Sequence, residues 1–258
     1  MEDRGIIGQL NPAFKLATHG FFMLLLTIIS DPFTSFLLML IPLIITFTML
    51  RLPAKILFTT FVSFLFLFFL STWSLAAFGR GETIWFQWAW FHFTKEGLMN
   101  GLTIGFRMLA FLYYGFIFIM TTNPTSFVLS LMQQFRLRPK WAYALLAGIR
   151  FLPLFHQELA QIRAAHRVRG VHRATSLRER LQTAFRFTIP LLAQGIRKAE
   201  RVAIALEARG FDGSWNRTFY RTIPWGYKDV VYFVVLLLAH GILIGLSTAL
   251  GMIRWGLV

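Results

Sequence analysis

The chain has 258 residues, of which 56% are hydrophobic and only 14% are charged. Soluble domains are about a quarter charged, so this composition excludes an ordinary soluble domain and predicts an integral membrane protein. The formal net charge is +15, and residues 123–228 hold 18 of the 26 basic side chains but only 5 of the 11 acidic ones. One segment therefore carries +13, which argues against an evenly basic surface for nucleic acid.

Apolar runs of about the length that a helix needs to cross a bilayer predict five membrane spans, at 16–30, 33–50, 55–73, 97–121 and 227–249. Asp31 and Pro32 predict a tight turn between the first two spans. The residues before the first span include acids and no apolar stretch, so we expect no cleavable signal peptide. The chain is predicted to be an all-α, polytopic integral membrane protein.

The basic residues predict the orientation of the spans. With the N-terminus in the cytoplasm, Arg51, Lys55 and the basic segment all lie on the cytoplasmic side of a cell membrane, as the positive-inside rule requires. The loop 74–96 then lies outside and contains three tryptophans, Trp85, Trp88 and Trp90. Indole rings settle at the level of lipid headgroups, so an interfacial belt is favoured over a ligand site here.

This pattern divides the chain into an N-terminal membrane domain, a cytoplasmic helical segment and a C-terminal membrane helix, with bounds at 1–122, 123–226 and 227–258. In the cytoplasmic segment, Pro124 can begin a short helix that ends near Arg136. Pro139 can begin a longer helix that ends at Gly170, with a kink at Pro153.

A third cytoplasmic helix is expected to open around Pro190. Each of the two long helices carries an apolar stripe at helical spacing: Leu152, Phe155, Leu159 and Ile162 on one, and Leu192, Ile196, Ala199, Ala203 and Leu206 on the other. Small residues four apart, Gly195, Ala199 and Ala203, allow close approach of a second helix, and Ala160 with Ala164 offers a matching face. We therefore expect the two helices to cross in contact.

Both long helices end in Arg-Gly, at Arg169-Gly170 and at Arg209-Gly210. A glycine in the left-handed conformation commonly ends a helix, and a terminal cation is favoured by the helix dipole by about 0.3–1 kcal/mol. Capping alone explains each end, and basic helices lying on anionic lipid would explain the charge. The fixed fork of a guanidinium also suits bidentate pairing with a carboxylate of a partner protein.

Five short motifs, taken together, carry a resemblance to a known family. They are N-P-A-F-K-L at 11–16, T-T-N-P at 121–124, I-R-F-L-P-L at 149–154, A-A-H-R-V-R-G at 164–170 and E-A-R-G-F at 207–211. In this order, with four spans before the basic segment and one after it, the chain resembles the transmembrane coupling subunit (T component) of energy-coupling factor transporters.

The resemblance implies that the cytoplasmic helices are coupling helices whose ends dock into two ABC-type ATPase subunits. Carried onto matching positions, the docking residues are Arg169, Gly170, Ala208, Arg209 and Gly210. In the first motif, Val168 stands before the arginine at a position where the family usually has a small residue. This difference leaves open whether the two ATPases are identical. A small substrate-binding membrane protein (S component) is the third implied partner, beside the lipid bilayer. The A-A-H-R-V-R-G motif resembles subunits associated with thiamine or its pyrimidine precursor, with biotin, cobalt and nickel as alternatives.

Several kinds of chemistry are not supported by the sequence. There is no cysteine and no G-x-x-x-x-G-K-[ST] motif, so we expect ATP to be bound by partner subunits and no cofactor by this chain. The six histidines show no spacing suited to a helical metal site, so we predict none. Arg107 lies well inside the fourth span and is the one candidate for an intramembrane polar site; pairing with backbone carbonyls is the alternative.

We therefore predict a non-catalytic subunit that transmits ATP-driven motion of two ATPases to an S component for vitamin or metal uptake. A membrane-anchored basic scaffold on anionic lipid is the alternative. An enzyme acting on lipid is less favoured, because no cluster of intramembrane carboxylates or histidines is present.

Overall fold

The computed structural model describes residues 5–50, 52–79, 83–88, 91–168, 176–215, 218–253 and 256. The elements follow in the order α1 (Gly5–Gly8), α2 (Pro12–Thr27), α3 (Pro32–Met49), α4 (Ala54–Phe78), β1 (Ile84–Trp88), β2 (Phe91–Thr94), α5 (Lys95–Thr121), α6 (Pro124–Gln134), α7 (Pro139–Val168), α8 (Leu177–Ala208) and α9 (Tyr227–Ala249). They form two compact units, one of Met1–Asn123 with Ile223–Val258 and one of Pro124–Thr222. The first is called the membrane unit and the second the coupling unit.

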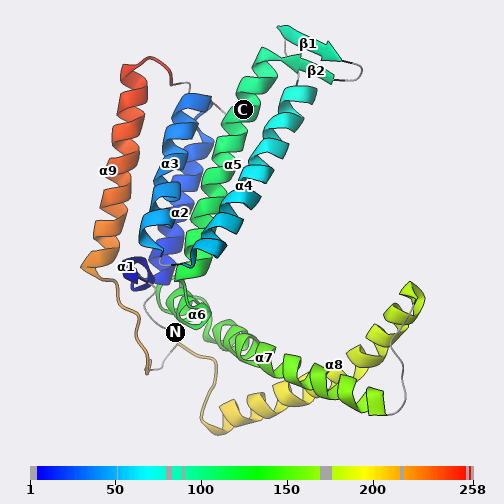
Figure 1. Ribbon diagram of the computed structural model, residues 1–258. Coiled ribbons are helices and arrows are strands. Elements are labelled where there is room, and N and C mark those ends of the chain that lie inside the picture. The colour runs from blue at the N-terminus through cyan, green and yellow to red at the C-terminus, as the bar shows by residue number, and fades with distance from the viewer. Residues whose placement is uncertain are drawn as a thin grey trace. The chain divides into compact units, whose positions relative to one another are not determined.

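Within the membrane unit, α2, α3, α4, α5 and α9 lie side by side (Figure 1). Four described helices, α3, α4, α5 and α9, are long and apolar enough to cross a membrane. The predicted all-α, polytopic membrane fold is thereby confirmed. The first expected span differs, because α2 has 16 residues and so covers only about 24 Å at a rise of about 1.5 Å per residue. By length alone, α2 falls short of the roughly 30 Å hydrocarbon core.

The helix starts in the membrane unit are set by local chemistry. Asp31 accepts a hydrogen bond from the Thr34 N–H at 2.6 Å and precedes Pro32 at the first position of α3. Thr94 likewise accepts from the Gly97 N–H at 3.1 Å at the start of α5. Such side chains satisfy amide donors that the first helical turn leaves without partners.

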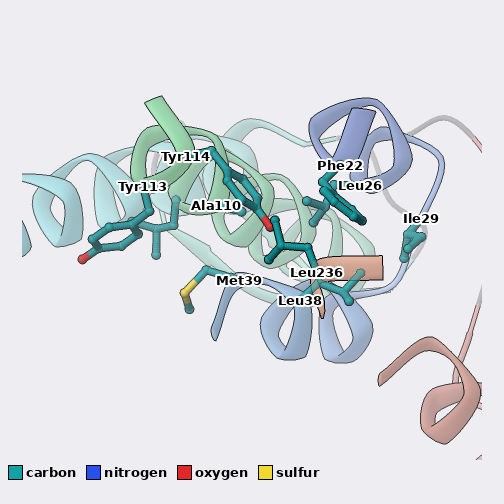
Figure 2. Close-up of a cluster of buried hydrophobic side chains, with 10 residues drawn as sticks. Phe22, Leu26, Ile29, Leu38, Met39, Ala110, Tyr113, Tyr114 and Leu236 are labelled. Atoms are coloured by element: carbon teal, nitrogen blue, oxygen red, sulfur yellow. The ribbon is translucent and has the colours of Figure 1, made fainter. Parts of the chain in front are cut away.

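The core of the membrane unit is a cluster of side chains from α2, α3, α5 and α9. Figure 2 shows members of this cluster, which include Phe22, Leu26, Leu38, Tyr114 and Leu236. Buried polar groups also link its helices. The Nδ1 atom of His240 lies 2.8 Å from the Leu236 carbonyl, which assigns the ring proton to Nδ1, so Nε2 accepts from the Tyr114 hydroxyl at 3.1 Å.

Helices α4 and α5 approach each other closely along a stripe of glycines, which the sequence analysis does not predict. Gly97, Gly101 and Gly105 stand four apart on α5. A Cβ atom on Gly101 would lie 2.8 Å from the Thr72 carbonyl oxygen of α4, closer than real Cβ contacts allow. Only residues without a side chain permit this contact between backbones.

The predicted outer loop contains two short strands, β1 and β2, which pair antiparallel between α4 and α5. Their aromatic and β-branched composition, in the run T-I-W-F-Q-W, suits extended backbone. Trp85 and Trp88 lie in β1, while Trp90 lies outside the described residues.

Asn11 connects the start of α2 to the chain leading into α9. Its side-chain oxygen accepts from the Ala13 N–H at 3.0 Å, its side-chain nitrogen donates to the Ile223 carbonyl at 3.2 Å, and its backbone N–H donates to Asp229 at 2.7 Å. Asn11→Ala keeps the backbone bond but removes the helix cap and the bond to Ile223. We expect it to lower stability by about 2 kcal/mol, since a cap and a hydrogen bond contribute about 1 kcal/mol each.

Thermal unfolding of the purified protein in detergent measures this loss as a lower Tm. Asn100→Ala is the matched control, because Asn100 is exposed on α5. Equal Tm values for the two variants would show that the Asn11 side chain does not contribute as proposed.

In the coupling unit, α6 and α7 pack through Val128, Met132 and Ala142. The predicted starts of these helices at Pro124 and Pro139 are confirmed, and α7 continues through Pro153. The predicted start of α8 near Pro190 is wrong. It begins at Leu177, because Ser176 and Glu179 form a capping box, and Pro190 lies inside the helix.

Candidate functional site: the crossed helices and the end of α8

Helices α7 and α8 cross within the coupling unit (Figure 1). Gly195 of α8 faces the Phe155 ring, 3.3 Å from where its Cβ would lie. His166 of α7 meets Phe187 of α8 with ring centroids 5.1 Å apart. Later residues of α7 therefore contact earlier residues of α8, so the helices run in opposite directions.

The crossing was predicted, but its contact face on α7 differs from the prediction. Ala160 and Ala164 are exposed, whereas Phe155, Leu159 and Ile162 are partly buried. On α8, Gly195 does lie at the contact, but Leu192 and Ile196 of the predicted stripe are exposed. Phe155 of α7 thus meets the smallest residue of α8, and the alanine face of α7 is exposed.

The end of α8 is a Schellman motif. Arg209 is the C-cap, and Gly210 follows with φ +77°, the left-handed conformation predicted for it. The Gly210 N–H donates to the Glu207 carbonyl at 2.8 Å, and the Phe211 N–H donates to the Leu206 carbonyl at 2.9 Å. This arrangement satisfies terminal carbonyls of the helix.

The capping motif leaves the polar end of the helix accessible. Ala208, Arg209 and Gly210 are all exposed. Apart from the chain neighbours of Gly210, no atom of the described residues lies within 4 Å of where its Cβ would be. A guanidinium is thereby presented beside backbone that a partner can approach closely. The other predicted end, Arg169-Gly170, lies outside the described residues; α7 is described as far as Val168, which is 90% exposed.

A groove of about 580 Å³ lies beside the end of α8, between the first half of α7 and the last turns of α8. Its walls include Tyr143, Ala147 and Phe151 of α7 and Ala203 and Leu206 of α8. Phe211, the last residue of the Schellman motif, packs on Tyr143 with ring centroids 5.1 Å apart. The spacing of Tyr143, Ala147 and Phe151 by four is visible in the sequence but was not assigned to a groove.

A further exposed apolar face lies on α8 between Leu181 and Ile196. It consists of five residues at helical spacing: Leu181, Phe185, Ile189, Leu192 and Ile196. An apolar face of this extent in a membrane-associated protein needs lipid or another protein to cover it.

Arg107 makes a backbone contact inside the membrane unit. Its Nη2 donates to the Ile29 carbonyl at 2.8 Å, just beyond the end of α2, while its Nε is buried without a partner among the described residues. This is the predicted alternative for Arg107, in which the cation pairs with a backbone carbonyl. A cation at the negative end of a helix dipole stabilises that end.

Two of the sequence motifs meet in space. Lys15, from N-P-A-F-K-L, is buried and donates to the hydroxyls of Thr121 at 3.0 Å and Thr122 at 3.4 Å, from T-T-N-P. The sequence analysis placed Lys15 outside the first span, whereas it lies inside α2. This contact joins the start of α2 to the end of α5, directly before the coupling unit begins.

Comparison with known proteins agrees with this architecture. The CbiQ family, described as cobalt transport protein, matches residues 3–220. The energy-coupling factor transporter transmembrane protein EcfT 1 of Listeria monocytogenes is 30% identical over 180 residues, which cover 67% of this chain and 68% of that protein. The EcfT protein of Streptococcus equi is 24% identical over 241 residues, 90% of this chain and 89% of that protein.

The family match extends over α1 to α8 and includes both Arg-Gly pairs of the sequence. The EcfT protein of Bacillus subtilis is 29% identical over 167 residues, 61% of this chain and 63% of that protein. The chain therefore belongs to the CbiQ/EcfT family, the transmembrane coupling components (T components) of energy-coupling factor transporters.

Proposed function

We propose that this T component couples two ABC-type ATPase subunits to a small substrate-binding membrane protein, the S component. ATP is bound and hydrolysed by the ATPases, and this chain acts without catalysis or cofactor. The N-terminus and the coupling unit are cytoplasmic. Motion of the ATPases is passed through the crossed helices to the S component in the bilayer.

The observation that carries this proposal is the end of α8. A Schellman motif holds Arg209 exposed, next to a glycine that leaves space for a partner's backbone. In a partly dry groove, a guanidinium can make two charge-assisted hydrogen bonds to one carboxylate, and such bonds are about twice as strong as neutral ones. By the matching motif, Arg169 and Gly170 form the second docking end, so one crossed pair engages two ATPases.

The exposed apolar face of α8 supports a protein partner beyond the ATPases. Its side chains, from Leu181 to Ile196, carry no polar specificity, so they suit a partner that must slide or tilt against them. We assign this face to contact with the S component. The substrate proposed for that component is thiamine or its pyrimidine precursor, with biotin, cobalt and nickel as alternatives.

Purification of the tagged chain from its native membrane tests the proposal. We expect mass spectrometry to find three further subunits. Two are ATPases, either two different proteins or two copies of one, and the third is a small apolar membrane protein that carries the substrate. Recovery of the chain with anionic lipid alone, and with no ATPase, would favour the scaffold function instead. Identification of the small molecule that dissociates from the denatured complex would decide the substrate.

A further inference from the structure

The contact between α7 and α8 contains a polar cluster of three side chains. Glu158 of α7 forms an ion pair with Lys198 of α8. With its amide nitrogen turned toward the carboxylate, Gln194 of α8 donates to both Glu158 oxygens, at 3.1 and 3.0 Å. The Glu158 side chain is 12% exposed and that of Lys198 27% exposed, so solvent reaches the cluster only in part.

The geometry of the cluster fixes one helix against the other. Gln194 and Lys198 stand one turn apart on α8, so both point toward the same carboxylate. Two donors at different heights along α8 restrain its rotation as well as its distance from α7. Their attraction exceeds that of a surface pair, because partial exclusion of water lowers the effective dielectric constant.

The apolar part of the same contact offers less resistance to a change in crossing angle. Gly195 lies between the two donors and meets the flat ring of Phe155. A glycine has no side chain to interlock with the ridges of α7, and interlocking ridges are what normally hold a crossing angle. The polar cluster is therefore the specific restraint at this point.

The cluster is also separated from the two predicted docking arginines by the same number of residues along the sequence. Glu158 precedes Arg169 by 11 positions, and Lys198 precedes Arg209 by 11 positions. At a helical rise of about 1.5 Å per residue, the α8 arm is about 16 Å long, and α7 extends about 15 Å from Glu158 to Val168, its last described residue. A change of roughly 10° in the crossing angle moves the end of either arm by about 3 Å. A displacement of this size is enough to take a bidentate arginine out of its pairing geometry.

We propose that Glu158, Gln194 and Lys198 form the fulcrum of the two coupling helices and set the spacing of their docking arginines. This inference rests on the proposed docking of ATPases at the two helix ends. The three side chains are positioning residues: they touch neither ATP nor substrate. They determine how much of the ATPases' motion becomes a change in the angle between α7 and α8.

Spin labels measure the crossing angle directly, because the chain has no cysteine to remove. Ala165→Cys and Ala205→Cys place exposed labels 7 positions beyond Glu158 and Lys198, one on each arm. Double electron–electron resonance spectroscopy then gives the distribution of distances between the two spin labels in the purified transporter complex, with and without ATP and vanadate. In the otherwise unchanged protein we expect a narrow distribution that shifts on nucleotide binding.

Glu158→Lys puts two cations face to face. Each label lies about 10 Å along its arm, so a change of roughly 10° in the crossing angle moves it by about 2 Å. We expect the mean label distance of this variant to shift by about that amount, or its distribution to broaden by as much. The reversed pair, Glu158→Lys with Lys198→Glu, should restore the narrow distribution and its response to nucleotide. If the lysine variant does not fold, Glu158→Gln takes its place as the test. It keeps the side-chain shape but removes the charge, and we expect it to broaden the distribution. Glu200→Gln is the control, since Glu200 is exposed on α8.

The outcomes separate the fulcrum from the proposed function. If Glu158→Lys and Glu158→Gln both keep the original distribution, or if the reversed pair fails to restore it, the fulcrum is overturned while ATPase docking stands. If the unchanged protein recovers no ATPase on purification, the proposed function fails, and the label distances still report whether the cluster holds the angle.

Discussion

Replacing Arg169 and Arg209 together by alanine is expected to release both ATPases while leaving the chain folded in the membrane. Removing one partner of a buried, hydrogen-bonded charge pair costs about 2–5 kcal/mol, so two such losses weaken the complex by roughly a thousandfold or more. Arg209 is exposed, so its replacement removes no contact within the folded chain core. Co-purification of the ATPases with the tagged chain measures the effect.

The matched control removes the same number of charges from the same cytoplasmic segment. Arg197 and Arg201 are exposed on α8 but lie away from its end, so Arg197→Ala with Arg201→Ala should keep the ATPases bound. Equal loss in the control would indicate general electrostatic attraction, which also falls steeply with salt. Arg209→Lys further distinguishes docking through paired arginines from general electrostatic attraction, because a lysine keeps the charge but lacks the planar fork of donors. Recovery of the ATPases at the original yield with the double alanine variant would contradict docking through these arginines.

The second large effect is expected from Gly101→Leu in the membrane unit. Even a Cβ atom at this position would lie 2.8 Å from the Thr72 carbonyl oxygen, so a leucine must push α4 away from α5. Overpacking of a tight contact costs about 1–3 kcal/mol and occasionally more, and backbone atoms cannot move aside as a flexible side chain can. We expect loss of monodisperse protein on size-exclusion chromatography in detergent, or a Tm lowered by many degrees.

Gly115→Leu is the control on the same helix. Outside the backbone of α5 itself, none of the described residues has an atom within 4 Å of where a Cβ of Gly115 would be, and α5 is continuous at both positions. Leucine favours helix more than glycine by nearly 1 kcal/mol, so this variant should be neutral or slightly stabilised. A similar Tm for the two leucine variants would show that the glycine contact does not hold α4 against α5.

The distinction between local and tertiary control is visible in the helix ends. The starts of α3, α6 and α7 and the left-handed Gly210 were predicted, because a proline, a cap or a glycine acts within one turn of the chain. The start of α8 was missed although its signal, Ser176 followed by Glu179, is equally local. Pro190 predicts a later start, but it lies inside α8.

The sequence by itself determined the membrane fold class, the short motifs that define the family and the exposed Arg-Gly end at Arg209, because each depends on composition or on neighbours within a few residues. Only the tertiary structure decided which face of α7 meets α8, that Lys15 is buried against Thr121, and that Glu158 pairs with Lys198. A helical stripe allows several partners of similar chemistry. The choice among them depends on backbone distances between residues far apart in the chain, such as the 106 positions between Lys15 and Thr121.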